Sequence, residues 1–255
     1  MNDTVNYDGT IVKFDKLGGG ILDRCIRNGY PIDAVRYLPL WRYLIKPNDI
    51  CYDIGAYIGT HSIAFSLCGG QVHAFEASPN NFDRCKTHCE PFNVKTHKAA
   101  LFDKEKEDLT RFGDCNWDDC GNIPVSESNP EQQIKYVILE KFCEENSIPW
   151  PNFIKMDIEG MESIVLNTFH LEKVLKNRPI MYIEKHPGNC VKYEDFPSKV
   201  NFPSSVSVED GGFDFNRIRD EWGYVITRIE NNQLVELDKN LDLNPLDREI
   251  ICFSK

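Results

Sequence analysis

A turn rich in small residues is the first feature of this sequence that could do chemistry. Asp53, Gly55 and Gly59 follow the pattern Asp-x-Gly-x-x-x-Gly between a short apolar run, Ile50 to Ile54, and a helix signal that begins at Thr60. Glycines after a strand let a ligand approach the main chain, and the start of the next helix offers unpaired N–H groups. The pattern predicts a small-ligand site, although it is not the Gly-x-Gly-x-x-Gly turn of dinucleotide-binding proteins.

A carboxylate ends the next apolar run. Glu76 closes the strand predicted from Gln71 and comes about seventeen residues after Gly59. A carboxylate in this place accepts both hydroxyls of a ribose in charge-assisted hydrogen bonds, and it would repel a 2′-phosphate. The two signals together predict a ligand that contains a nucleoside, with NAD rather than NADP as the dinucleotide alternative.

Acidic side chains also end two later strands. Asp157 and Glu159 are two residues apart, so both could face one cleft, and Glu184 ends the following strand. Asp157 and Glu184 could orient an acceptor hydroxyl or bind a divalent cation such as Mg²⁺ that acidifies it. His186 is the favoured general base, because imidazole titrates near neutral pH. Lys155 is expected to point to the face opposite Asp157.

Strands and helices that alternate along the chain must position these groups. Strands are predicted over 50–54, 71–76, 94–101, 153–157, 180–184, 223–229 and 249–253, and helices over 33–45, 60–67, 80–89, 137–145, 163–175 and 215–221. The alternation predicts an α/β, Rossmann-like, mostly parallel seven-stranded sheet with helices on both faces and an antiparallel C-terminal edge. Residues 1–48 are expected to form an N-terminal segment with a hairpin and a leading helix, ahead of a main domain over 49–255.

Three segments together resemble the FkbM-type methyltransferases, which are class I, S-adenosylmethionine-dependent enzymes. The segments are Asp53 to Ser62, Val72 to Pro79, and Ile154 to Glu162 with Val165 and Leu166. The resemblance extends over 50–184. It departs from the family at Ala77-Ser78-Pro79, where a proline usually follows the acid directly, and at Asn167-Thr168, where a glycine is usual.

The resemblance implies a place for S-adenosylmethionine at three strand ends. Asp53, Gly55, Tyr57, Gly59, Thr60 and Ser62 would line its methionine end, Glu76 its ribose, and Ala77 and Ser78 the edge of its adenine, with Asp103 and Asp114 as further adenine-side candidates. His61 is expected to be a helix cap or a neighbour of the cofactor. No Asp/Asn-Pro-Pro-Tyr follows the fourth strand, as it commonly does in methyltransferases of nucleobase amino groups. The predicted activity is therefore O-methylation of a sugar or another small molecule.

The amino-acid composition limits the kinds of molecule that this chain is expected to bind. The 29 basic and 40 acidic residues give a net charge of −11, which disfavours nucleic acid. No apolar run could insert into a membrane, and the polar start argues against a signal peptide, so a cytoplasmic protein is expected. The ten cysteines lack a CxxC pair and are expected to be thiols. An NAD-dependent oxidoreductase and a non-catalytic cofactor-binding protein of the same fold remain alternatives. The identity of the acceptor and the oligomeric state are left open.

Overall fold

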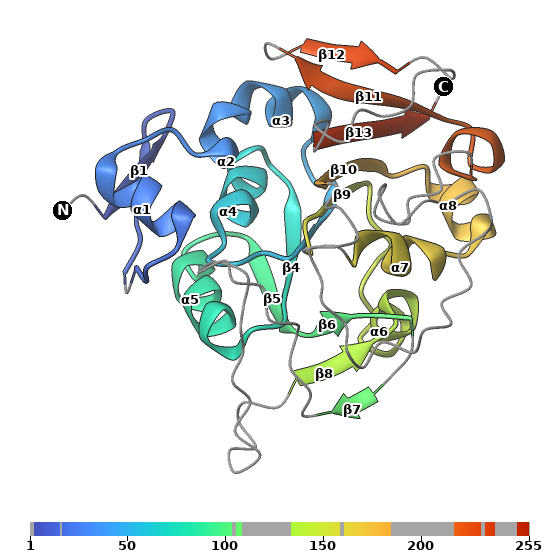
Figure 1. The fold of residues 1–255 in the computed structure, drawn as a ribbon, viewed down its shortest axis with the longest axis horizontal. Coiled ribbons are helices and arrows are strands. Elements are labelled where there is room, and N and C mark those ends of the chain that lie inside the picture. The colour runs from blue at the N-terminus through green and yellow to red at the C-terminus, as the bar shows by residue number, and fades with distance from the viewer. Residues whose placement is uncertain are drawn as a thin grey trace.

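The computed structural model describes residues 3–15, 17–103, 106–108, 134–158, 161–184, 217–230, 233–237 and 249–254. Its centre is an eight-stranded sheet with the order β12-β11-β13-β10-β9-β3-β4-β5 (Figure 1). In chain order, the strands are β3 (Ile50–Ile54), β4 (Gln71–Glu76), β5 (Val94–Lys98), β9 (Phe153–Met156), β10 (Ile180–Glu184), β11 (Tyr224–Glu230), β12 (Gln233–Glu236) and β13 (Glu249–Ser254). The five strands from β10 to β5 are parallel, and β13, β11 and β12 form the antiparallel edge.

This sheet confirms the predicted Rossmann-like α/β class, with eight strands instead of seven because β12 adds a short edge strand. Helices cover both faces, as the strands' apolar side chains require (Figure 1). They are α1 (Ile21–Asn28), α2 (Asp33–Arg36), α3 (Leu38–Leu44), α4 (Thr60–Leu67), α5 (Pro79–Cys89), α6 (Leu139–Glu145), α7 (Glu162–Asn167) and α8 (Leu171–Asn177). One core, which includes Trp41 and Phe65, lies under α1 to α5, and the other, which includes Phe169 and Val174, lies under α6 to α8.

Two small sheets lie outside the large one. The strands β1 (Thr4–Tyr7) and β2 (Thr10–Lys13) form an antiparallel hairpin with a sheet of its own. The strands β6 (Ala100–Leu101), β7 (Lys106–Asp108) and β8 (Ile134–Val137) form the other. The N-terminal hairpin therefore does not extend the central sheet.

Several element boundaries differ from the prediction. The helix expected over 33–45 is divided into α2 and α3 at Tyr37, just before Pro39, which has no N–H to donate to a preceding turn. The strand expected over 94–101 is divided into β5 and β6. The helix expected over 137–145 begins only at Leu139, after β8, and a π-helix, η3 (Arg217–Glu221), lies where a helix over 215–221 was expected.

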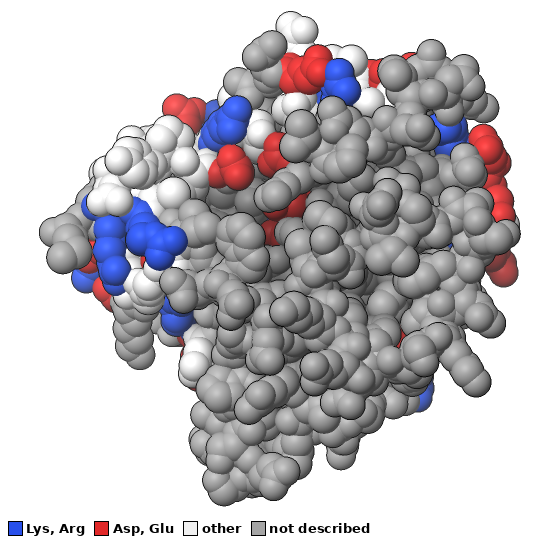
Figure 2. All heavy atoms as spheres, in the orientation of Figure 1, with Lys and Arg blue, Asp and Glu red and all other residues white. Residues whose placement is uncertain are grey.

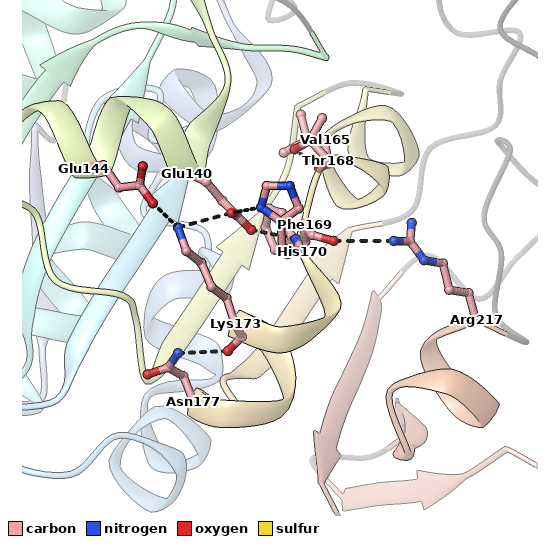
Figure 3. Close-up of polar contacts among 9 residues, drawn as sticks. All are labelled: Glu140, Glu144, Val165, Thr168, Phe169, His170, Lys173, Asn177 and Arg217. Atoms are coloured by element: carbon pink, nitrogen blue, oxygen red, sulfur yellow. Dashed lines mark hydrogen bonds and ion pairs between the residues drawn. The ribbon is translucent and has the colours of Figure 1, made fainter.

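The helix expected over 163–175 is divided into α7 and α8, and a buried carboxylate is bonded to the break. His170 has an extended backbone at the start of α8, and its N–H donates to Glu140 Oε1 at 2.7 Å (Figure 3). Glu140 Oε2 lies 2.5 Å from His170 Nδ1 and 3.2 Å from Lys173 Nζ. Glu140 thus satisfies an N–H at the start of α8 from the neighbouring helix α6.

The seven described cysteines are all free. The closest thiols are Cys85 and Cys89, whose Sγ atoms lie 3.9 Å apart on α5. Within the described ranges, no helix has the length and apolar character needed to cross a membrane.

Candidate active site

The glycine turn, residues Gly55 to Gly59, joins β3 to α4 and is shaped by close packing. Gly55 has φ +80°, and a Cβ there would lie 1.8 Å from the carbonyl oxygen of Asp157. Gly59 has φ +89°, and its Cβ would lie 2.5 Å from Cys89 Sγ. Both positions therefore require glycine for their backbone shape and for the approach of β9 and α5, in addition to any ligand.

Glu76 connects the end of β4 to this turn. Its Oε2 accepts the N–H of Tyr57 at 2.8 Å, and its Oε1 accepts the N–H of Ser78 at 2.8 Å. Burial raises the pKa of Glu76 to about 7, although the two N–H donors oppose the shift. Each carboxylate oxygen keeps a second acceptor position. Glu76 is thus suited to gain further hydroxyl donors and to become more acidic when it does.

Ser78 serves the helix that follows. It is the N-cap of α5, and its Oγ accepts the N–H of Asn81 at 3.4 Å. Ala77 is partly buried between Glu76 and this cap. The structure therefore keeps the predicted ribose and adenine-side residues Glu76, Ala77 and Ser78 in one short stretch at the carboxyl end of β4.

A buried lysine joins the ends of β3 and β9. Lys155 Nζ lies 3.4 Å from Asp53 Oδ1 and 3.3 Å from Asp157 Oδ2, and it donates to the carbonyl oxygen of Gly55 at 2.9 Å. Burial alone would lower the pKa of Lys155, but Asp157 and Asp53 raise it above its ordinary value. The prediction that Lys155 points away from Asp157 was wrong, because residues two apart in a strand share a face.

Ser62 and Thr60 support the turn from the first residues of α4. Ser62 Oγ donates to Asp53 Oδ2 at 2.6 Å, and neither side chain is exposed. Thr60 is also buried, and its carbonyl oxygen accepts the hydroxyl of Tyr7 at 3.1 Å. Asp53 is therefore fixed by Ser62 and Lys155 beneath the glycine turn.

Carboxylates gather where the central strands end. Figure 2 shows acidic side chains on the visible face between α2 and the strands β10 and β13. The carboxylates that interact across this edge are Asp33, Asp157, Glu184 and Glu249. Asp157 follows β9, and Glu184 ends the neighbouring β10, so the two predicted acceptor-side acids lie on adjacent strands. Acids at this edge are suited to accept hydrogen bonds from hydroxyl groups.

Glu249 belongs to this edge and was missed by the sequence analysis. It lies opposite Glu184 on β13 and accepts hydroxyls from Tyr37 at 2.7 Å and from Tyr182 at 2.8 Å. Burial, followed by Glu249, raises the pKa of Tyr182 well above its ordinary value. No local pattern could have revealed Glu249, because its contact with Tyr37 joins residues 212 positions apart.

His61 lies close to the same edge. Its ring packs 6.0 Å from that of Trp41 and 6.3 Å from that of Tyr182. Its Nε2 is buried and has no hydrogen-bond partner among the described residues. Burial lowers the pKa of His61 to about 3, Lys155 adds to the shift, and Asp157 opposes it. The imidazole is therefore neutral at pH 7.

The remaining predicted residues are placed as follows. Asp103 is exposed in the segment after β6. Glu159, His186 and Asp114 lie outside the described residues, so their predicted roles stay predictions. Within the described part of the chain, no group of three or more His, Cys, Asp or Glu side chains could hold a metal ion.

Comparisons with known proteins agree on one kind of enzyme. The sequence profile described as "Methyltransferase FkbM domain" matches residues 53–231. The curated hexuronic acid methyltransferase AglP of Haloferax volcanii is 28% identical over 150 residues, which are 56% of this chain and 58% of that protein. The match thus spans little more than half the length of this relative.

Solved structures of methyltransferases are similar at lower identity. Precorrin-6y C5,15-methyltransferase from Geobacter metallireducens is 11% identical with a TM-score of 0.44, over 94% of each chain. The O-methyltransferase from Bacillus cereus in complex with SAH is 12% identical with a TM-score of 0.43, over 88% of this chain and 81% of that one. Similarity at these values does not bear on the reaction.

Proposed function

We propose that this chain, which belongs to the FkbM methyltransferase domain family, transfers a methyl group from S-adenosylmethionine to an oxygen of a sugar or another small molecule. The observation that carries the proposal is the 2.8 Å hydrogen bond from the Tyr57 N–H to Glu76 Oε2. It joins the glycine turn and the acid at the end of β4 into a single site. The family supports the methyl transfer, and the hexuronic acid methyltransferase supports a carbohydrate acceptor.

The residues at the turn fit the proposed cofactor. Glu76 keeps acceptor positions for two ribose hydroxyls, and Ala77 and Ser78 follow it at the adenine side. The main chain of the turn from Gly55 to Gly59 would hold the methionine end, above the buried Asp53. Bound there, S-adenosylmethionine would supply a methyl group on a positively charged sulfur.

The acceptor would lie toward β9 and β10. Asp157 and Glu184 would accept hydrogen bonds from its hydroxyls, or hold Mg²⁺ that lowers the pKa of the reacting hydroxyl. Lys155 Nζ lies 3.3 Å from Asp157 Oδ2 and would hold this carboxylate in place at the end of β9. His186 remains the proposed base that removes the hydroxyl proton, and the neutral His61 imidazole is a further hydrogen-bonding group at this edge.

A transfer assay tests the proposal. Labelled methyl from S-adenosylmethionine should appear on an acceptor in a panel of neutral sugars and hexuronic acids. The product should resist mild alkali, because a methyl ether is stable where a methyl ester is hydrolysed. Alkali-labile label would overturn transfer to a hydroxyl while keeping the methyltransferase. No transfer to any acceptor, with the cofactor still bound, would favour a non-catalytic protein of the same fold.

The Asp157→Asn variant tests the acceptor side. It should bind S-adenosylhomocysteine normally and lose roughly a hundredfold or more in turnover, the usual scale for losing a group that moves or orients a proton. Repeating the assay with EDTA distinguishes the two roles of the acids. Activity lost with EDTA and restored by Mg²⁺ would assign them to a cation, and activity retained would assign them to the acceptor directly. Intact turnover in Asp157→Asn would contradict this site.

A further inference from the structure

The N-terminal segment, consisting of β1, β2 and α1, lies beside α4 and α5 and forms hydrogen bonds with both helices (Figure 1). From β1, Tyr7 donates its hydroxyl to the carbonyl oxygen of Thr60 at 3.1 Å. From α5, His88 places one ring nitrogen 3.0 Å from the carbonyl oxygen of Ile58 and the other 3.1 Å from that of Asp15. The end of the turn is thus tied to a part of the chain that precedes residue 53, where the family profile begins.

A buried ion pair forms the third tie. Asp23 on α1 has no exposed surface, and Arg84 Nη2 donates to its two carboxylate oxygens at 2.8 and 2.9 Å. The Arg84 side chain is only 13% exposed. A Cβ on Gly18 would lie 2.9 Å from Asp23 Oδ2, so the chain before α1 passes directly against this carboxylate. Two charges buried this well keep a fixed geometry, because separating them would leave each one desolvated and unpaired.

Arg84 carries this geometry to the glycine turn. Its guanidinium carbon lies 5.3 Å from the centre of the Tyr57 ring, within the range of a cation–π contact. Tyr57 has φ +50°, in the left-handed region that is unfavourable for any residue with a Cβ. In that conformation its N–H reaches Glu76 Oε2 at 2.8 Å. The contact with Arg84 therefore acts on the residue whose backbone connects the turn to Glu76.

We propose that Asp23 and Arg84 are positioning residues of the cofactor site. Through them, the N-terminal segment holds Tyr57 in the strained conformation that aligns the glycine turn with Glu76 for the adenosyl cofactor. Neither residue needs to touch the cofactor, since both act through the Tyr57 ring. This inference rests on the proposed function, because it assigns a role in binding S-adenosylmethionine.

A double-mutant cycle measures whether Asp23 and Arg84 influence cofactor binding through Tyr57. Calorimetry would give the Kd of S-adenosylhomocysteine for the unaltered protein, for Arg84→Lys and for Asp23→Asn. The same three measurements would then be repeated in proteins that also carry Tyr57→Leu. Arg84→Lys keeps the charge but loses the planar, two-pronged donor. When Tyr57 is present, Arg84→Lys should raise the Kd roughly tenfold, the scale of a desolvated cation–π contact. In the Tyr57→Leu background it should raise the Kd less than about twofold. Asp23→Asn should follow the same pattern, with a smaller rise.

Two controls separate positioning from general destabilisation. Tyr57→Phe keeps the ring, so Arg84→Lys should still raise Kd in that background. Arg42→Lys alters an exposed ion pair with Asp8 at 2.6 Å and should leave Kd unchanged. Melting temperatures should fall for Asp23→Asn and Arg84→Lys whichever residue stands at position 57, because the ion pair also stabilises the fold.

The outcomes are distinguishable. A rise in Kd that depends on the ring at position 57 supports the proposal. An equal rise with Tyr57 and with Tyr57→Leu, or no rise at all, overturns it and leaves the methyltransferase proposal standing. If the unaltered protein does not bind S-adenosylhomocysteine, the proposed function and this inference both fail.

Discussion

The protonation state of Glu76 should control how tightly the cofactor binds. The pKa of Glu76 is about 7 because it is buried, and hydrogen bonds from ribose hydroxyls would be stronger to its ionised form. The affinity for S-adenosylhomocysteine should therefore increase as the pH is raised towards 7, by up to about tenfold per pH unit, and should level off above pH 7. Titration calorimetry between pH 5.5 and 8.5 measures this dependence.

The Glu76→Gln variant is the control for that pH profile. Without an ionisable group at position 76, the Kd should vary little over the same pH range. At pH 8 the Kd of the variant should be roughly tenfold or more above that of the unaltered protein, the scale of a lost charge-assisted hydrogen bond. If the variant kept the slope of the unaltered protein, another group would be responsible for it.

Lys155 supports both acids at the centre of the site. Lys155→Met would leave Asp53 and Asp157 without the cation that lies 3.4 and 3.3 Å away. Removing one partner from a buried pair typically costs about 3–5 kcal/mol, so urea unfolding should show a loss of that order. Lys141→Ala removes half of an exposed pair with Glu145 and should cost about 0.5 kcal/mol or less. A loss for Lys155→Met as small as the control's would contradict a structural role for this lysine.

Among the elements, the start of α8 is stabilised by a carboxylate from another helix. Glu140 accepts the N–H of His170 at 2.7 Å and pairs with Lys173, as Figure 3 shows. Glu140→Ala should lower the free energy of unfolding by about 0.5–2 kcal/mol, because the N–H of His170 at the start of α8 loses its acceptor. Glu144→Ala, which removes a 68% exposed partner of the same lysine, should cost well under 1 kcal/mol. Equal losses in urea unfolding would show that the cap contributes nothing beyond a surface ion pair.

The sequence predicted the strands that form the site better than the helices around them. Buried parallel strands are continuous apolar runs that end in polar residues, so the ends of β3, β4, β9 and β10 were expected to within one residue. The breaks at Tyr37 and at His170 were missed, because apolar spacing continues across both. Pro39 was a visible signal for the first break, whereas the second is bonded to Glu140, a contact 30 residues away in sequence that leaves no local pattern.

In the site, too, residues that form a local sequence pattern were predicted, and residues brought in by distant contacts were not. Asp53, Gly55, Gly59 and Glu76 lie in one short stretch with a recognisable spacing, and the structure brings them together. Glu249 and Asp23 come from opposite ends of the chain and meet the site only through the fold. The orientation of Lys155 was predictable from the two-residue period of a strand, so that error lay in applying the rule.

For the molecule as a whole, neutral histidines packed in the structure link stability to pH. His73 Nδ1 and His97 Nε2 lie 2.9 Å apart on β4 and β5, and burial lowers the pKa of each to about 4. Between about pH 6.5 and pH 4 the unfolded chain binds more protons than the folded one, so stability should fall as the pH falls through this window. Urea unfolding at successive pH values measures the slope, up to about 1.4 kcal/mol per pH unit for each histidine.

Substituting both rings identifies the source of that slope. The double variant His73→Phe, His97→Phe keeps the aromatic packing with Phe75 and Phe142 and should lose part of the acid sensitivity. A slope equal to that of the unaltered protein would assign the acid sensitivity to other groups.

The measurement that tests the central claim most directly is calorimetric titration of the whole chain with S-adenosylhomocysteine and, separately, with NAD. We expect S-adenosylhomocysteine to bind, NAD not to bind, and Glu76→Ala to weaken the first binding roughly tenfold or more while the protein stays folded. Binding of NAD without S-adenosylhomocysteine, or binding that Glu76→Ala leaves unchanged, would contradict the assignment of the glycine turn and Glu76 to a methyl-donor site.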